Sequence, residues 1–548
     1  MPRAFVFLVA LLAAACGNLP PARLHEVDVC VYGATSAGVI AALQAKAEGR
    51  TVALLDCDDW VGGLTTAGLG ATDVGNKDAI GGLAREFYRR IRKHYARPEA
   101  WTRQMRAEFK GRGHDESADA AWTFEPSVAQ ATFAAMLAEA GIAPVPFRLA
   151  ARRAVQKDGP RLLAIASDDG RLVAARCFLD CSYEGDLLAA AGCAFAVGRE
   201  GNAMYGETLN GVQTANAKFH QFAGRVDPYV VPGDPASGLL PGIDPTGPGA
   251  EGAGDARVQA YCFRICATDD PDNRVPWPRP DGYDARDYEL LLRNLEAGPA
   301  EAPWHPVAMP NRKTDSNNNK GVSSDFLGGN YAYPTADRAT RRAIVAAHRR
   351  WQQGLYWTLA NDARVPAKVQ AEFRRFGLAK DEFVATGNWP PLLYVREARR
   401  LVGEAVVTEA HCMGRTVAAD PIGLGAYAMD SHNVQRYVAA DGSVKNEGDV
   451  QVKVPKPYGI PYGAIVPQRL HATNLLVPVC VSASHIAYGS IRMEPVFMVL
   501  GQSAAIAAGL ALDRGLELQD VPYAELRARL EAANQALAWP HAGTWILP

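Results

Sequence analysis

The stretch VDVCVYGATSAGVIAALQAKAEGRTVALLD, residues 27–56, decides the fold of this chain. Its apolar runs, glycines and Ala-rich segment predict, in order, a strand over Val27–Tyr32, a tight turn over Gly33–Gly38, a helix over Val39–Ala47 and a strand over Thr51–Leu55. A strand that turns directly into a helix aims the first free backbone N–H groups and the positive end of the helix dipole at one point. Because a diphosphate binds well at such a point, the stretch indicates a nucleotide site. The alternative is a βαβ unit that binds no ligand.

The turn matches most of the dinucleotide-binding fingerprint G-x-G-x-x-G, which is followed about 20 residues later by an acid that binds ribose. Gly33 and Gly38 occupy the first and third glycine positions, and Asp56 ends the second strand as the acid. Thr35 replaces the second glycine, which normally lets the backbone approach the pyrophosphate. The residues predicted to bind the nucleotide are Gly33, Thr35, Ser36, Ala37, Gly38 and Asp56.

Length and composition indicate a large globular protein. With 548 residues, the chain exceeds one ordinary hydrophobic core, so two domains are expected. It is 48% hydrophobic and 21% charged, and its formal net charge is −2. Since neither the net charge nor any run of Lys and Arg would attract a polyanion, we expect no nucleic-acid partner.

The N-terminus predicts export. A Met-Pro-Arg start precedes an apolar run over Ala4–Ala15, which is too short to span a bilayer but suits a secretory signal. We therefore expect residues 1–16 to form a signal peptide. The segment LAAAC, ending at Cys16, resembles a bacterial lipobox with alanine where leucine is preferred. Lipidated Cys16 would tether the mature chain to a membrane, whereas cleavage after Ala15 would release a soluble periplasmic protein.

The cysteines predict no metal site. The other nine are scattered along the chain, and none forms a CxxC pair. Those in strand-like apolar runs are interpreted as buried free thiols. No spacing typical of zinc, haem or iron–sulfur ligands is present.

Two glycine-containing segments repeat the features of the opening stretch. The segment WVGGLTTAGLGATD, residues 60–73, contains Gly62 and Gly63, where missing side chains would let the backbone lie against a flat ligand. Farther along, a strongly apolar strand leads to Gly185 and Asp186 at the start of a short Ala-rich helix. This is a second strand that ends at a helix N-terminus beside a polar group.

Residues 200–460 differ from the rest because they are rich in Pro, Trp, Asn and Gly. The cluster MPNRKTDSNNN, residues 309–319, could bind the hydroxyl groups of a polar ligand, although Asn-rich loops also cap their own turns. Helices are predicted over Ala336–Leu359 and Tyr394–Val406. The last third returns to strand and helix patterns and ends in a helix over Val496–Leu512.

Together these segments resemble an FAD-dependent oxidoreductase of the two-dinucleotide-binding flavoprotein type. More narrowly, they resemble an exported bacterial branch whose members are often labelled xanthan lyase. The similarity runs from Val27 to Asp513. It is carried by VYGATSAGVIAA, WVGGLTTAGLGATDVGNKDAIGG, FEPSVAQ, DCSYEGDLLAAAG, KTDSNNN, YVREARRLVGE, MDSHNVQRY and SASHIAYGSIRMEPVFMVLGQSAA.

The resemblance implies an α/β fold, with a Rossmann-like FAD-binding domain that is discontinuous in sequence and an inserted α+β substrate domain. We expect the FAD-binding domain over residues 26–200 and 466–548, and the substrate domain over 201–465. The threonine in the fingerprint is normal for this branch. The resemblance also implies further FAD contacts: Gly62 and Gly63 near the diphosphate or flavin, Gly185 and Asp186 near the ribitol or diphosphate, and the N-terminus of the helix carrying Gly501 at the flavin N1/C2 edge.

Flavin chemistry on an alcohol or amine needs hydride transfer from carbon to N5 and a base that takes the heteroatom proton. His485 is the first candidate for this base, because it lies between the last strand and the flavin-facing helix. His432 is the second, since Asp430 and Asn433 beside it could orient its ring. Each could instead be a structural histidine.

Three further residues are candidates for orienting the substrate or stabilising charge: Arg396, Arg492 and Glu494. Arg396 could equally form a buried ion pair with Glu397 or Glu404.

We therefore expect an exported FAD-dependent oxidoreductase that transfers a hydride between a polar organic substrate and flavin N5. The substrate would be a small molecule such as a sugar, a uronide or another hydroxylated compound. One alternative is a flavin-dependent reductase of an activated C=C bond, in which an arginine delivers the proton. Another is a polysaccharide lyase, which needs no flavin. The sequence does not identify an electron acceptor.

Overall fold

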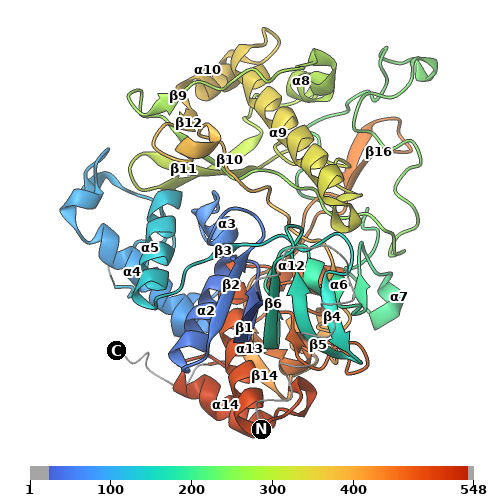
Figure 1. Cartoon of the computed structure of the whole chain (residues 1–548). Helices are drawn as coiled ribbons and strands as arrows, with labels where there is room; N and C mark the ends of the chain where they lie inside the picture. The colour runs from blue at the N-terminus through green and yellow to red at the C-terminus, as the bar shows by residue number, and fades with distance from the viewer. Residues whose placement is uncertain (1–23, 116, 541–548) are drawn as a thin grey trace.

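The computed structural model describes residues 24–115 and 117–540 (Figure 1). The predicted signal peptide and Cys16 lie outside them. The opening stretch folds as a βαβ unit, as predicted, with β1 (Leu24–Tyr32) parallel to β2 (Val52–Asp56) and α2 (Ser36–Ala47) between them. The helix begins at Ser36 rather than at Val39, because Thr35 caps its N-terminus.

A seven-stranded sheet forms the nucleotide-binding half. Its order is β3 (Val145–Pro146), β2, β1, β6 (Leu172–Asp180), β5 (Arg161–Ala166) and β4 (Val155–Asp158), and β20 (Leu475–Leu476) also pairs with β6. The pairs among β3, β2, β1, β6 and β20 are parallel, whereas β4 and β5 add an antiparallel extension. Since β20 comes from the last third of the chain, this half is discontinuous in sequence, as predicted.

The helix α13 (Glu494–Arg514) packs closely on α2 in the core of this half and also contacts α4 (Gly82–Tyr95) and α14 (Tyr523–Ala532). The helix α5 (Pro126–Glu139) packs on α4 and α2. Among the described residues, α13 alone is long and apolar enough to cross a membrane, but 94% of its apolar window is buried in the protein. Gly501 permits the close approach to α2, because a Cβ there would lie 2.4 Å from the carbonyl oxygen of Ala37.

A second sheet, of five strands, lies in the other half of the molecule, at the top of Figure 1. Its order is β10 (Trp304–Met309), β11 (Lys313–Asn318), β8 (Ile265–Thr268), β12 (Gly377–Ala379) and β9 (Arg274–Val275). All its pairs are antiparallel. The neighbouring helices are α8 (Glu289–Ala297), α9 (Arg338–Asn361) and α10 (Ala367–Arg375).

A buried charge cluster joins the two halves. Lys313 of β11 lies 2.8 Å from Glu125, the residue that precedes α5, and 2.7 Å from Glu382. Asp381 lies 2.9 Å from the same ammonium group. The surrounding carboxylates compensate the buried cation, so this contact should fix how the halves meet.

The prediction of a helix over Tyr394–Val406 is wrong. This segment is extended and contributes β13 (Arg400–Leu401), which pairs with β7 (Phe195–Ala196). Arg396 bonds to Asp325, while its neighbour Glu397 bonds to His485. Tertiary partners of this kind override the helical propensity of the local sequence.

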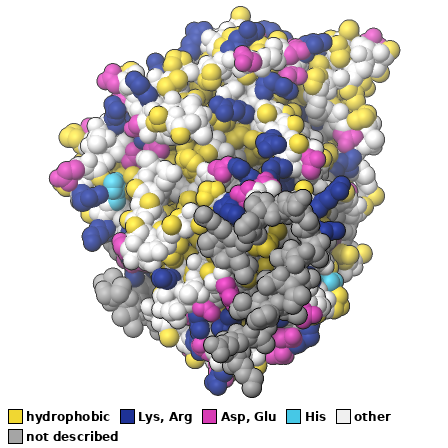
Figure 2. Space-filling model, viewed as in Figure 1, with side chains coloured by type: hydrophobic (Ala, Val, Ile, Leu, Met, Phe, Trp, Pro, Cys, Tyr) yellow, Lys and Arg dark blue, Asp and Glu magenta, His cyan; other side chains and the backbone are white. Residues whose placement is uncertain are grey.

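Part of the predicted substrate segment packs on the nucleotide-binding half. The strands β14 (Pro421–Gly425) and β19 (Tyr458–Pro461) form an antiparallel pair, and Ser503 of α13 donates a 2.7 Å hydrogen bond to the Ile422 carbonyl. On the visible face, Lys and Arg alternate with Asp and Glu without a large patch of one sign (Figure 2).

Candidate functional site

The β1–α2 turn is built around Thr35. Its Oγ1 donates a 2.7 Å hydrogen bond to the Cys181 carbonyl and accepts one of 3.3 Å from the Gly38 N–H. The side chain is thereby held against the end of β6. This orientation explains how threonine can replace the second glycine of the fingerprint.

The two remaining fingerprint glycines are required by close packing. A Cβ on Gly33, whose φ is +96°, would lie 2.7 Å from the Ser182 nitrogen, and one on Gly38 would lie 1.9 Å from the Gly33 carbonyl oxygen. These contacts hold the turn tightly between α2 and β6. The first N–H groups of α2, on Ser36 and Ala37, have no acceptor within the helix and can meet an anion.

A second glycine turn lies against the first. Gly62 and Gly63 have φ values of +94° and +58°, and the Gly62 N–H donates a 2.7 Å bond to the Ala34 carbonyl. A Cβ on Gly63 would meet the Tyr183 hydroxyl at 2.3 Å and the Cα of Thr35 at 3.1 Å. The short helix α3 (Gly63–Thr66) begins at this turn, so its N-terminus lies near that of α2.

Glu494, the first residue of α13, lies at the same place. Its carboxyl oxygens accept hydrogen bonds from Ser36 Oγ at 2.6 Å, Thr65 Oγ1 at 2.8 Å and Tyr183 Oη at 2.8 Å. Burial raises the pKa of Glu494, and the three hydroxyl donors only partly offset this effect. The structure thus places this predicted catalytic candidate with the cofactor turns.

A crevice of about 270 Å³ opens outside the carboxyl ends of β1, β2 and β6, where α/β sheets bind ligands. Asp58 lines it, and burial together with the charges of Glu184 and Asp56 raises the pKa of Asp58 to about 8. Asp56 accepts a 3.0 Å bond from the Asp58 N–H and therefore shapes the turn after β2. Tyr32 and Arg148 also line the crevice.

Gly185 and Asp186 lie at the start of α6 (Asp186–Ala190), on the same edge of the sheet. Both oxygens of Asp186 are held by Arg341, at 2.7 and 2.9 Å, and Arg399 adds a bond of 2.8 Å. Burial raises the pKa of Asp186, but the bonds and charges of these arginines outweigh it and lower the pKa overall. In the structure, Asp186 anchors α9 to this edge.

These features fit a dinucleotide. Two glycine turns, the N-termini of α2, α3 and α13, and a polar crevice meet at the carboxyl edge of a parallel sheet. Ser36, Ala37, Gly62 and Gly63 present backbone that can approach a diphosphate. Asp56 and Asp58, at the end of β2, lie on the side where a ribose would be bound.

A polar cavity of about 280 Å³ lies in the other half. Its lining joins the Asn-rich strand to the MDSHN segment: His220, His305, Asn317, Asn318, Asn319, Tyr427, Ala428, Asp430, His432 and Gln451. Such groups donate and accept hydrogen bonds in a small space. The cavity is therefore suited to a small ligand with several hydroxyl groups.

His432 is oriented by Asp325, not by Asp430 or Asn433 as expected. Its Nδ1 lies 2.8 Å from Asp325 Oδ2, whereas its Nε2 is 3.9 Å from the nearest oxygen of Asp430. Burial, followed by the charge of Arg396, lowers the pKa of His432 to about 4. Since the carboxylate can only accept, Nδ1 carries the proton and Nε2 is a free acceptor at neutral pH.

Arg396 completes this group. Its Nη2 lies 2.9 Å from Asp325 Oδ1, so the predicted pairing with Glu397 or Glu404 is wrong. Burial raises the pKa of Asp325, but the charge of Arg396 and the hydrogen bond from His432 outweigh it and lower the pKa overall. Arg396 therefore keeps Asp325 ionised and able to hold the His432 ring.

His485 forms a second pair of this kind. It begins α12 (His485–Ile491), and its Nδ1 lies 2.7 Å from Glu397 Oε2. Its backbone N–H donates a 2.9 Å bond to Glu200, and its side chain is only 2% exposed. The residues that line the polar cavity do not include His485. Gln259 links the two pairs, because its side chain donates to the Glu397 carboxylate at 2.8 Å and accepts from the backbone N–H of His432 at 3.1 Å.

Arg492 and Tyr394 connect the cavity toward the cofactor turns. Arg492 lies just before α13. Its guanidinium donates to the Asp430 carbonyl at 3.0 Å and to the Tyr394 hydroxyl at 3.2 Å. On the cofactor side, a Cβ on Gly68 would lie 2.0 Å from the Arg264 carbonyl oxygen. The guanidinium carbon of Arg264 lies 5.8 Å from the Tyr394 ring centre. The glycine-rich segment and the cavity wall are thus in one contact network.

The family model described as "FAD dependent oxidoreductase" matches residues 28–530. The chain belongs to this family. This FAD-dependent oxidoreductase therefore binds FAD, for which the paired glycine turns supply a fitting site. No curated protein matches the chain.

Solved flavoenzymes are similar to parts of the FAD-dependent oxidoreductase. L-Amino acid deaminase from Proteus vulgaris is 11% identical, with a TM-score of 0.23 and coverage of 38% of this chain and 56% of the deaminase. The 3-ketosteroid-Δ4-(5α)-dehydrogenase from Rhodococcus jostii RHA1 is 15% identical, with a TM-score of 0.20 and coverage of 33% and 50%. A double mutant of a flavin monooxygenase from Stenotrophomonas maltophilia is 16% identical, with a TM-score of 0.19 and coverage of 28% and 38%. The chain thus spans 38% to 56% of the length of these proteins.

The structure divides the predicted site residues of this oxidoreductase into groups. His432 lines the cavity, Arg396 pairs with its partner Asp325, and Arg492 donates to the carbonyl of the lining residue Asp430. His485 bonds to Glu397, which Gln259 links to His432, and Glu494 lies at the cofactor turns. Sequence reasoning missed Asp325, Gln259 and Tyr394 as partners. They come from segments far apart in the chain, so no local spacing could have linked them.

Proposed function

We propose that this FAD-dependent oxidoreductase oxidises a hydroxylated organic compound, such as a sugar or a uronide, bound in the polar cavity. One observation carries the proposal: a neutral histidine, held by a buried carboxylate, faces a cavity lined by amide, imidazole and carboxylate groups. A proton acceptor and hydroxyl-binding groups are the parts that alcohol oxidation requires of the protein.

Each step on the protein side can be assigned. Asn317, Asn318 and Gln451 hold substrate hydroxyl groups by hydrogen bonds. His432 Nε2 takes the proton of the reacting hydroxyl, while Asp325 holds the opposite edge of the ring and stabilises the imidazolium that forms. Bound FAD supplies the acceptor for the hydride at N5. Arg396 keeps Asp325 charged throughout.

Anaerobic mixing of the flavin-loaded enzyme with a panel of sugars, uronates and other hydroxylated compounds tests the proposal. A member of the panel should bleach the visible flavin band, and its deoxy analogue at the reacting carbon should not. Reoxidation of the reduced enzyme by unsaturated compounds, without bleaching by any hydroxylated compound, would contradict it.

A second candidate is reduction of an activated C=C bond. Arg492 favours it, because this buried guanidinium lies 3.6 Å from Asp430 Oδ2, at the wall of the cavity, and could deliver a proton. In that reaction, chemically reduced enzyme would be reoxidised by an unsaturated acid or ketone. The saturated analogue would leave it reduced.

We also propose that the chain is exported and held at a membrane through lipidated Cys16. The support is the short apolar run followed by the lipobox-like LAAAC. Mass analysis of the mature N-terminus, with Cys16→Ser as the control, tests this. An unprocessed N-terminus would contradict export, and a cleaved but unlipidated one would contradict the tether. The electron acceptor is then expected among membrane or periplasmic carriers.

A further inference from the structure

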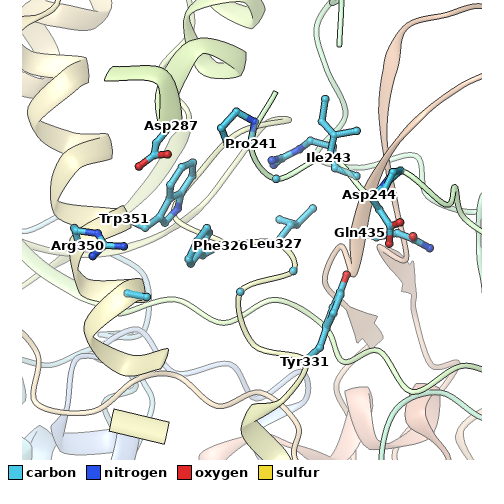
Figure 3. Close-up of a pocket in the computed structure, with 16 residues that line it drawn as sticks. Pro241, Ile243, Asp244, Asp287, Phe326, Leu327, Tyr331, Arg350, Trp351 and Gln435 are labelled. Atoms are coloured by element: carbon cyan, nitrogen blue, oxygen red, sulfur yellow. The ribbon is translucent and has the colours of Figure 1, made fainter. Parts of the chain in front are cut away.

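A cavity of about 470 Å³ lies outside the site proposed above, between α9 and β16 (Gln435–Val438) (Figure 3). Figure 3 shows Trp351, Arg350 and Asp287 on one side of it, and Asp244, Gln435 and Tyr331 on the other. A cavity of this volume holds a ligand of one or two rings.

One wall is aromatic. The rings of Phe326 and Trp351 are stacked, with centres 5.0 Å apart and planes 11° apart. Apolar residues of the wall, among them Leu327 and Ile243, extend this surface. Trp351 also stacks on Tyr288, with ring centres 5.2 Å apart, so the wall offers a ligand apolar side chains and ring edges.

The polar groups of the cavity are incompletely satisfied within the described residues. Trp351 Nε1 and Gln435 Oε1 are buried there without hydrogen-bond partners. Groups of this kind cost free energy when left unpaired, and a shift of either side chain toward a ligand would relieve that cost.

Arg436 sets the charge that the ligand should carry. Its side chain is buried and donates hydrogen bonds to two neutral oxygens, from Nε to Asn446 Oδ1 at 3.0 Å and from Nη2 to the Gly321 carbonyl at 3.1 Å. Nη1 lies beside the cavity residue Gly242, where an added Cβ would come within 3.3 Å. Burial lowers the pKa of Arg436 to about 10, as expected for a cation without an anionic partner.

The acids of the cavity leave this cation uncompensated. Asp244 is already paired with Arg257 at 2.7 Å and accepts from Thr246 at 2.6 Å. Burial, with the charge of Asp284, raises the pKa of Asp287, and the charge of Arg350 on the same side of the cavity acts against this rise. Asp287 thus faces Arg350 and leaves Arg436 without an acidic partner in the lining.

We propose that this cavity is a second binding site, for an organic carboxylate that carries a ring. The ring would pack against the apolar wall that Phe326, Leu327 and Ile243 form, and the carboxylate would pair with Arg436. The site adjoins the reverse side of the candidate active site, since Phe326 follows Asp325 in the chain and Gln435 lies three residues after His432. The proposal does not depend on the reaction catalysed there.

Calorimetric titration of the flavin-loaded enzyme with benzoate and with D-glucuronate tests the proposal and separates an aromatic acid from a sugar acid. Benzyl alcohol and D-glucose are the uncharged counterparts. At least one acid should bind with a Kd of about 1 mM or tighter, and its counterpart at least about tenfold more weakly. Equal binding of acid and uncharged counterpart, or no binding of either acid, would overturn the proposal.

Three variants locate the binding. Ala347→Phe fills the cavity without removing a charge and should abolish the heat of binding, while Arg436→Gln should weaken binding at least about tenfold. Arg375→Gln, an exposed site on α10, is the matched control and should leave the Kd unchanged. Binding that survives Ala347→Phe would place the carboxylate elsewhere. If Arg436→Gln does not fold, the Ala347→Phe result decides.

Discussion

Replacing Thr35 by valine removes one hydroxyl and keeps the shape of the side chain. Two hydrogen bonds are lost, the 2.7 Å bond donated to the Cys181 carbonyl and the 3.3 Å bond accepted from the Gly38 N–H. An N-cap bond contributes about 1 kcal/mol, and a buried carbonyl that loses its donor costs about 1–3 kcal/mol. Thr35→Val should therefore lower the free energy of unfolding by about 2–4 kcal/mol.

Denaturant unfolding followed by far-UV circular dichroism measures this change, and the visible flavin absorbance per chain measures cofactor retention. Thr35→Ser keeps the hydroxyl and should stay within about 1 kcal/mol of the wild type. The valine variant should also retain less flavin, since the turn that faces the diphosphate is no longer fixed to β6. A valine variant as stable as the wild type, or a serine variant as unstable as valine, would refute this account of the turn.

Three further predictions concern stability. Gly501→Ala should cost about 1–3 kcal/mol and lower the melting temperature, because its Cβ would lie 2.4 Å from the Ala37 carbonyl oxygen; an unchanged melting temperature would show that α2 and α13 can separate freely. Lys313→Met leaves buried carboxylates unpaired and should cost about 3–5 kcal/mol by denaturant unfolding; a neutral result would mean that the cluster does not join the halves. Burial, then the charge of Asp430, raises the pKa of Asp449 from 3.8 to about 8, so folding takes up a proton and the stability of the wild type falls as the pH rises through this window. Asp449→Asn removes that loss, and its advantage over the wild type should grow by about 2–4 kcal/mol between about pH 5 and pH 8; parallel curves would contradict the raised pKa.

The nucleotide-binding half could be predicted from the sequence because its signals are local. Residues 27–56 contain a strand, a glycine turn, an Ala-rich helix and an acid. Each of these patterns predicts the same local structure in any parallel sheet. The family resemblance then supplied the discontinuous domain. What remained hidden was how Thr35 fits, because its partner Cys181 is 146 residues away.

The cavity site was harder to predict because its pairs are distant in sequence. His432 and Asp325 are 107 residues apart, and His485 and Glu397 are 88 apart. A sequence pattern could point to Asp430 as the partner of His432 by adjacency, but the fold brings Asp325 closer. The helix predicted over Arg396 and its neighbours was wrong for the same reason, because the partners that hold this segment extended, Asp325 and His485, lie on other segments.

The rate of anaerobic flavin reduction in His432→Gln, with the substrate identified by the bleaching panel, tests the central claim most directly. Loss of a general base should slow reduction by about 10²–10⁴-fold at neutral pH, with flavin still bound. His94→Gln, a histidine on α4 that does not line this cavity, is the matched control and should change the rate by less than about threefold. Because burial and then the charge of Arg396 lower the pKa of His432 to about 4, the wild-type rate should stay level from about pH 6 to about pH 8 and fall toward pH 4. A His432→Gln rate within about threefold of the wild type would contradict the claim.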